Sequence, residues 1–502
     1  MKQLTGLDAT FLYMETASQF GHVSGLSIVE PPDDPGYEPL AAWRRQIEER
    51  LHLLEPLRRK VVDVPFRIDH PFWVDDPDFD LDFHVRHLAV PPPGRIDQLA
   101  ALVAEIVGRP LDRRHPLWES YVIEGLPEGR FSILTKIHHA TVDGASGAEL
   151  LTMMLDATAD GTEIPPPEDD WRSERQPTDI EVLTRATANL VRKPGRLLVL
   201  SARTARDLGR ATRNPVLVGA ANSFRSSLRG PVGSILNLGR RRDPEADPPP
   251  KPPRVMAPRT PFNASITAHR TLALRSTRLA AIKDIKNALG ATVNDVVMAA
   301  CAGGLRAYLL DHDALPDEGL IAMVPVSVRT GLEAERWTNR VSGLLATIPT
   351  DEADPLERVR RMHESMDNAK DLFQAIPAEE LTEFAQFPPP AVFARAIRMA
   401  VRFRLGDRLG SPINLVISNV PGPREPLYIA GARLRHYYPV STIVEGQGLN
   451  ITVQSYLDTL DFGLVGCREL VPDIDHLADL VVKDLEEMAK AAGLDIEVPI
   501  SV

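Results

Sequence analysis

Residues 131–144 place the strongest constraint on what this chain can fold into. The first seven of them, Phe-Ser-Ile-Leu-Thr-Lys-Ile, alternate apolar and polar side chains, which predicts a strand with one buried face. His138 and His139 end that strand, and Asp143 and Gly144 follow in a turn. Because successive side chains of a strand point to opposite faces, only one of the two histidines can face any given site.

The residue types in this segment fit three interpretations. In the first, an imidazole takes a proton from an alcohol or amine as that group attacks a carbonyl carbon, which contributes about 10²- to 10⁴-fold to the rate. In the second, the histidines only cap a core strand, and Asp143 and Gly144 are ordinary turn residues. A metal site is the third, and it is disfavoured because no other cluster of His, Cys or carboxylate lies nearby in sequence to complete a ligand set.

The pattern HHxxxDG resembles the signature of the CoA-dependent acyltransferase superfamily. The doubled histidine is most similar to the bacterial wax ester synthase/diacylglycerol acyltransferase family, in which the second histidine is taken as the general base. The resemblance therefore implies that His139 is the base and that His138 supports it. It implies a structural role in the loop for Asp143 and Gly144, and the sequence does not identify the partner of Asp143.

Further segments match the same family in the same order along the chain. They are residues 4–16, Pro-Leu-Trp at 116–118, Asn-Asp at 294–295, and residues 323–329, 337–342 and 414–423. Thr338 replaces the glycine that is usual in the segment 337–342, which leaves the geometry of that loop open. We expect Trp118 to be a buried anchor for a neighbouring strand and not a catalytic group.

Four residues of these segments are further candidates for the site. The resemblance places Glu15 near the active-site channel, and the alternative is an exposed carboxylate at a helix end. Asn294 can cap the apolar helix that begins there, or its amide can stabilise the oxyanion of a tetrahedral intermediate. Ser418 and Asn419 end a strand that, in related acyltransferases, crosses towards the other domain and helps to form the tunnel.

Composition excludes several other classes of protein. A net charge of −12 over 502 residues argues against a general nucleic-acid binder. Two cysteines, Cys301 and Cys467, form neither a disulfide framework nor a zinc pattern, so a reducing cytoplasm is expected. Acidic residues interrupt the start of the chain, which argues against a signal peptide, and no stretch approaches 18 uncharged apolar residues. We therefore expect a cytoplasmic protein whose membrane contact, at the inner membrane or at lipid droplets, is peripheral.

The charge pattern and the prolines predict three parts. Residues 1–171 form an N-terminal acyltransferase lobe, 172–261 a basic helical crossover with a proline-rich linker, and 262–502 a C-terminal acyltransferase lobe. Residues 172–242 contain fifteen Arg and Lys against four acidic residues. Such a basic segment fits an anionic membrane or lipid-droplet surface, the phosphates of CoA, or a solvated connection between the lobes.

The resemblance implies a two-lobed α/β fold like that of chloramphenicol acetyltransferase, with a mixed sheet flanked by helices in each lobe and the site at their interface. It implies acyl transfer from long-chain acyl-CoA to diacylglycerol, giving triacylglycerol, with no metal and no cofactor beyond the co-substrate acyl-CoA. The alternatives are wax ester synthesis with a fatty alcohol, another lipid hydroxyl as acceptor, or a non-catalytic lipid-surface protein. Acceptor, chain length and oligomeric state do not follow from the sequence.

Overall fold

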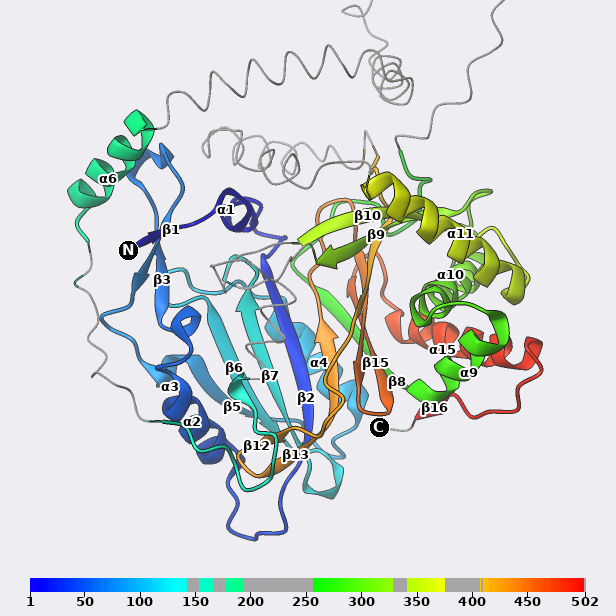
Figure 1. Cartoon of the computed structure of the whole chain (residues 1–502), viewed down its shortest axis with the longest axis horizontal. Coiled ribbons are helices and arrows are strands. Elements are labelled where there is room, and N and C mark those ends of the chain that lie inside the picture. Colours follow the sequence, from blue (N-terminus) through cyan, green and yellow to red (C-terminus); the bar gives the residue numbers. More distant parts are fainter. Residues whose placement is uncertain are drawn as a thin grey trace, which may run out of the picture. The chain divides into compact units, whose positions relative to one another are not determined.

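The computed structural model describes residues 1–141, 153–165, 175, 177–192, 256–327, 341–374, 407 and 410–500 of the chain (Figure 1). Contacts between residues divide the chain into two compact units. One comprises Met1–Asp179 and Pro258–Val502, and the other comprises Ile180–Ala257. Helix α6 (Asp179–Arg192) makes up most of the described part of the second unit.

The N-terminal lobe of the larger unit is built on a six-stranded mixed sheet in the order β12-β13-β2-β7-β6-β5. The predicted strand before the histidines is present as β7 (Phe131–His138), antiparallel to both of its neighbours. The other strands of the sheet are β2 (His22–Glu30), β5 (Val85–Ala89), β6 (Trp118–Glu124), β12 (Tyr428–Ile429) and β13 (Ala432–Val440).

Short elements complete this lobe. A three-stranded sheet in the order β1-β4-β3 lies beside helix α1. The bounds of these elements are β1 (Lys2–Gln3), α1 (Gly6–Tyr13), α2 (Pro39–Arg50), η1 (Glu55–Leu57), β3 (Arg59–Val62), η2 (Pro65–Arg67), β4 (Phe72–Asp75), α3 (Leu81–His84), α4 (Ile96–Val107) and η3 (Pro127–Gly129).

The C-terminal lobe is built on a seven-stranded mixed sheet in the order β10-β9-β11-β14-β15-β8-β16. Only β11 pairs in parallel, with β9 and β14, among the described strands of this sheet. The strands are β8 (Arg270–Arg278), β9 (Leu320–Ser327), β10 (Val341–Ile348), β11 (Leu415–Val420), β14 (Leu449–Tyr456), β15 (Thr459–Cys467) and β16 (Pro499–Ile500).

Four of the described helices cover one side of this sheet (Figure 1). They are α9 (Leu279–Leu289), α10 (Val293–Asp311), α11 (Pro355–Gln374) and α15 (Ile474–Ala491). By length and composition, α10 is the one helix among the described residues that could cross a membrane, but 72% of that stretch is buried within the protein. Its residues from Val296 to Ala302 have no exposed surface, so α10 is the central helix of the lobe's core.

One core joins the two sheets. Helix α4 packs between them, with Leu99 and Val103 fully buried. The same apolar cluster includes Leu134 of β7 on one side and Leu272 of β8 on the other. Because residues of α4 pack with residues of both sheets in one apolar cluster, the two lobes share part of their core.

The strand that crosses between the lobes is β13, which corrects the expectation for residues 414–423. Within that stretch, β11 stays inside the C-terminal sheet, whereas β13 pairs with β2 of the N-terminal sheet. A buried polar cluster fixes the crossing strand: Ser276 Oγ donates to Asp461 Oδ1 at 2.6 Å, and the Tyr437 N–H donates to Asp461 Oδ2 at 2.9 Å. Because Asp461 is fully buried, these hydrogen bonds favour one position of β13 over others.

Candidate active site

His138, the last residue of β7, is a buried side chain whose two ring nitrogens both have partners. Nδ1 accepts the backbone N–H of Ala140 at 3.0 Å. In the neutral ring the proton therefore sits on Nε2, which lies 3.2 Å from Oε1 of Glu15. The first histidine of the pair is thus held in one orientation by its own loop and by the start of the chain.

Glu15 connects three segments of the N-terminal lobe. Its Oε1 also accepts the N–H of Gly21 at 2.9 Å, and its Oε2 accepts Nε and Nη2 of Arg113 at 3.1 and 2.6 Å. The same Nη2 donates to the carbonyl of Leu12, near the end of α1. Burial raises the pKa of Glu15, but the hydrogen bond and charge of His138, the charge of Arg113 and the Gly21 N–H together hold that pKa well below its usual range.

His139 directly follows the last residue of β7. Its backbone N–H donates to the carbonyl of Gly21 at 2.7 Å. Its ring, which is partly exposed, stacks on Phe11 of α1 with the ring centroids 4.1 Å apart and the planes 12° apart. Stacking on Phe11 uses the face of the imidazole and fixes the plane of the ring. This geometry suits a proton acceptor whose backbone and ring plane are both fixed.

Gly21 has to be a glycine for the site to assemble. A Cβ atom at this position would lie 2.5 Å from Nε2 and 2.8 Å from Cε1 of His138. Gly21 also supplies the N–H that Glu15 accepts and the carbonyl that accepts the His139 N–H. Gly21 therefore links the two histidines: its N–H binds the carboxylate that contacts His138, and its carbonyl binds the backbone of His139.

The buried side chains of Lys136 on β7 and His22 on β2 bind the end of helix α4. Lys136 Nζ donates to the carbonyl of Arg109 at 2.6 Å and lies 3.6 Å from Glu119 Oε2. Burial lowers the pKa of Lys136 to about 8, although Glu119 opposes the shift. His22 Nε2 donates to the carbonyl of Val107, and burial together with the charge of Lys136 holds its pKa well below its usual range. These contacts satisfy carbonyls that a helix end leaves without partners.

In the C-terminal lobe, the structure brings two of the predicted residues together. Asn419 Nδ2, from β11, lies 3.5 Å from Asn294 Oδ1, at the limit of a hydrogen bond. Asn294 does not cap α10, which corrects one of its two expected roles. The cap is Thr292, whose hydroxyl accepts the Asp295 N–H while Asp295 accepts the Thr292 N–H. An Asp at the third helical position pairs reciprocally with Thr292, which leaves the Asn294 amide to face β11.

The remaining predicted residues differ in how far the structure describes them. Ser418 lies on β11 beside Asn419, with its side chain on the opposite face of the strand. Among the predicted site residues, the described hydrogen bonds form two groups. One group is around His138 and Glu15, and the other is around Asn294 and Asn419. Asp143, Gly144 and most of the basic stretch 172–242 lie outside the described residues, so their roles stay predictions.

Trp118 is a buried anchor, as expected. It is 1% exposed, and its Nε1 donates to the carbonyl of Leu57 at 2.8 Å. Within the described ranges, no group of three or more His, Cys, Asp or Glu side chains is arranged to hold a metal ion.

Sequence reasoning missed Phe11, Gly21 and Arg113. Arg113 lies 98 residues from its partner Glu15, and arginine next to a Pro-Leu-Trp segment carries no signal of that pairing. The position of Gly21 directly before a strand was the one available hint, because glycine there permits close approach of another group. Phe11 reads as an ordinary apolar residue of a short helix.

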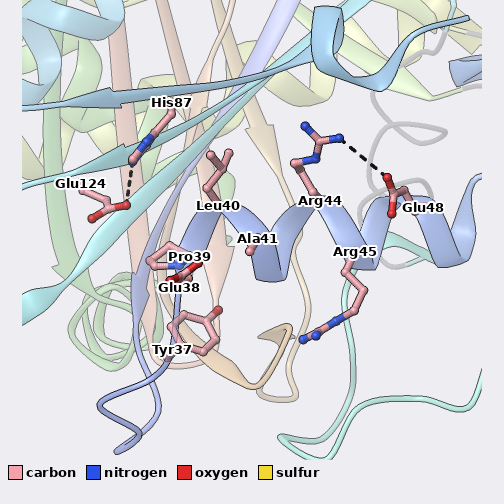
Figure 2. A pocket seen from close by; sticks show the side chains of 10 residues that line it. All are labelled: Tyr37, Glu38, Pro39, Leu40, Ala41, Arg44, Arg45, Glu48, His87 and Glu124. Carbon is pink, nitrogen blue, oxygen red and sulfur yellow. Dashed lines mark hydrogen bonds and ion pairs between the residues drawn. The ribbon is translucent and has the colours of Figure 1, made fainter.

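A separate cavity of about 620 Å³ lies at the other end of the N-terminal sheet (Figure 2). Its lining includes Arg44, Arg45 and Glu48 of α2 and the His87–Glu124 pair of β5 and β6, which are 2.7 Å apart. Glu124 follows Ile123, which pairs with Ser132 near the start of β7, whereas His138 is at the other end of β7. This open, mixed-charge cavity contains none of the predicted site residues.

Comparison with known proteins decides the family. Residues 4–297 match the wax ester synthase/diacylglycerol acyltransferase catalytic domain, and residues 337–489 match the C-terminal domain of the same family. The chain belongs to the wax ester synthase/diacylglycerol acyltransferase family. The resemblance inferred from the histidine motif is thereby confirmed.

Individual relatives span nearly the whole chain. A Mycobacterium tuberculosis protein named probable diacylglycerol O-acyltransferase is 36% identical, over 97% of this chain and 98% of its own length. The structure of a wax ester synthase/diacylglycerol acyltransferase from Marinobacter aquaeolei VT8 is similar with a TM-score of 0.66 and 29% identity, covering 98% of this chain and 100% of that one. The first condensation domain of the calcium-dependent antibiotic synthetase, at 15% identity and a TM-score of 0.55, covers 98% of this chain and 96% of its own, and shares the fold. These similarities confirm the predicted two-lobed architecture.

Proposed function

We propose that the protein transfers a long acyl chain from acyl-CoA to the hydroxyl of diacylglycerol, forming triacylglycerol and free CoA. The observation that carries the proposal is the second histidine of the family motif, His139, fixed by its backbone at Gly21 and by its ring on Phe11. The full-length relatives named as diacylglycerol O-acyltransferases support this choice of acceptor.

In the proposed reaction, His139 is the general base. It accepts the hydroxyl proton as the acceptor oxygen attacks the thioester carbon, and the resulting imidazolium gives that proton to the departing CoA thiolate. The acyl C–S bond breaks as the ester C–O bond forms, so protons and charge balance without a covalent enzyme intermediate. His138, Glu15 and Arg113 act as positioning residues, because they hold the turn that carries His139. Asn294 and Asn419 remain candidates for contact with the oxyanion.

Wax ester synthesis with a long-chain alcohol is the second candidate function. The family name includes both activities, and the Marinobacter aquaeolei relative carries both in its name. The same base and the same bond changes serve either acceptor, so the difference between them lies in the space available to the acceptor chain. Another lipid hydroxyl would use the same chemistry.

The deciding experiment measures release of the CoA thiol from palmitoyl-CoA with dioleoylglycerol, hexadecanol or no acceptor. Release that requires dioleoylglycerol and is lost in His139→Ala supports the proposal, whereas a preference for hexadecanol moves the assignment to wax ester synthesis. His87→Ala is the matched control, because this histidine pairs with a glutamate at the far end of the sheet. A His139→Ala protein that keeps wild-type turnover and a wild-type circular dichroism spectrum contradicts the proposed base.

We also propose that the protein works in the cytoplasm, at the surface of the inner membrane or of lipid droplets. A diacylglycerol acceptor partitions into such surfaces, and the basic stretch 172–242 has the charge to be drawn to anionic lipid. Cell fractionation tests the location: recovery only with the soluble fraction, in cells that accumulate triacylglycerol, argues against it.

A further inference from the structure

The connection between β3 and β4 exposes apolar side chains at its tip. Phe66 is 86% exposed, and Ile68, two residues later, is 37% exposed. Pro65 precedes them. We call Pro65, Phe66 and Ile68 the apolar tip.

Phe66 also has an unusual backbone conformation. Its φ is +61° and its ψ is 3°, in the left-handed region that residues with a Cβ atom adopt only rarely. A single exposed apolar residue needs no explanation, but here an unfavourable backbone conformation presents the largest side chain of a three-residue apolar group to solvent. The conformation is one that local propensity would not select.

The base of the same connection is fixed to the active-site segment. His70 Nδ1 lies 3.1 Å from the hydroxyl of Tyr13, and the two rings stack with centroids 6.0 Å apart. Tyr13 ends helix α1, and Phe11 of the same helix stacks on His139. Figure 1 shows the β3–β4 connection and α1 at the same end of the N-terminal lobe. The apolar tip and the histidine are therefore joined through one short helix.

From this geometry we infer that the apolar tip enters the interfacial layer of a lipid surface and holds helix α1, with the neighbouring His139, close to that surface. The inference deepens the proposed function, because its acceptor is a water-insoluble lipid held in such a surface. A lipid surface fits the tip better than a protein partner does. Three side chains are far fewer than the 20–30 residues that a stable protein interface uses on each side, whereas an aromatic ring on a short loop is well suited to the interface of a bilayer.

The test is flotation of the full chain with vesicles of dioleoylphosphatidylcholine containing dioleoylglycerol. Phe66→Ser is expected to weaken vesicle binding by about ten- to a hundredfold, which corresponds to the loss of one buried aromatic side chain. Phe66→Trp is expected to retain binding, and its added fluorescence should be quenched by brominated phosphatidylcholine. Leu345→Ser is the matched control, because this leucine is 55% exposed on β10 of the other lobe.

Activity separates this inference from the proposed function. With dihexanoylglycerol below its aggregation limit, Phe66→Ser should turn over at the wild-type rate, and the defect should appear only with acceptor in vesicles. Absence of turnover in every variant would contradict the proposed function, while the flotation result would still test the tip. Equal flotation of wild type and Phe66→Ser overturns the inference. So does a change in oligomeric state with unchanged vesicle binding, because the tip would then contact another copy of the chain.

Discussion

His138 Nε2 lies 3.2 Å from Glu15 Oε1, although 123 residues separate the two along the chain. The contact holds the first histidine of the motif in the tautomer whose Nδ1 accepts a hydrogen bond from the Ala140 N–H of the turn. That turn carries His139, and Gly21 connects both histidines to the same carboxylate. A residue that touches no reacting atom thereby controls the orientation of the proposed base.

Glu15→Gln is expected to lower kcat by about ten- to a hundredfold with little change in KM. Loss of the charge weakens the hydrogen bonds from His138 and Arg113, and small displacements of a catalytic group cost rate of this size. Steady-state kinetics with palmitoyl-CoA measure the effect. Glu124→Gln is the control, because that carboxylate also pairs with a histidine but lies at the far end of the sheet. Equal kcat values for the two variants would remove the positioning role.

The carboxylate of Glu15 should stabilise the fold at neutral pH and lose that effect in acid. Its pKa in the folded state is well below the value of 4.5 expected for the unfolded chain. The stabilisation is therefore complete above about pH 4.5, shrinks as the pH falls below that value, and is gone below the folded pKa. Urea denaturation of wild type and Glu15→Gln at pH 7 and pH 3.5 should show the larger difference at pH 7. If the difference in the free energy of unfolding between wild type and Glu15→Gln is larger at pH 3.5 than at pH 7, the prediction is wrong.

Gly21→Ala should disrupt the site while leaving the lobes folded. The new methyl group would lie 2.5 Å from His138 Nε2, so the ring has to move away from Glu15. We expect a loss of activity of at least about tenfold and a destabilisation of roughly 1–3 kcal/mol. Thermal denaturation and kinetics measure both. Gly36→Ala is the control, because Gly36 lies on an exposed loop and the nearest atom is 3.4 Å from the added carbon. This variant should have the activity and stability of wild type. A Gly21→Ala protein with wild-type activity would show that the His138 ring has room to shift.

Lys136→Met is expected to change how stability depends on pH in the alkaline range. The pKa of Lys136 is about 8 in the folded protein, against 10.5 in the unfolded chain, so the unfolded state binds more protons between these values. Wild type should therefore gain stability relative to the variant as the pH rises from about 8 to 10.5, by up to roughly 3 kcal/mol. Urea denaturation at pH 7.5 and 9.5 tests this. Lys483→Met is the control, because the Lys483 side chain is 65% exposed, and its difference from wild type in the free energy of unfolding should be the same at both pH values. If the difference for Lys136→Met is also the same at both pH values, burial does not lower the pKa of Lys136.

Local sequence pattern predicted the elements that depend on local interactions. The alternation before His138 predicted β7, and the apolar run after Thr292 predicted the start of α10. The capping role considered for Asn294 was wrong, because Asn is a common capping residue and only the reciprocal contacts of Thr292 and Asp295 show which residue caps the helix.

The sequence by itself determined the family, the histidine pair and the strand that presents it, because those depend on residue identity and on the two-residue period of a strand. Only the tertiary structure decided that Arg113 and Glu15 hold His138, that Phe11 stacks on His139, and that β13 is the crossing strand. Each of these contacts joins segments far apart in the chain. The packing of α1, α4 and the two sheets brings these residues together. A local pattern of side chains does not indicate which distant residue will lie nearby.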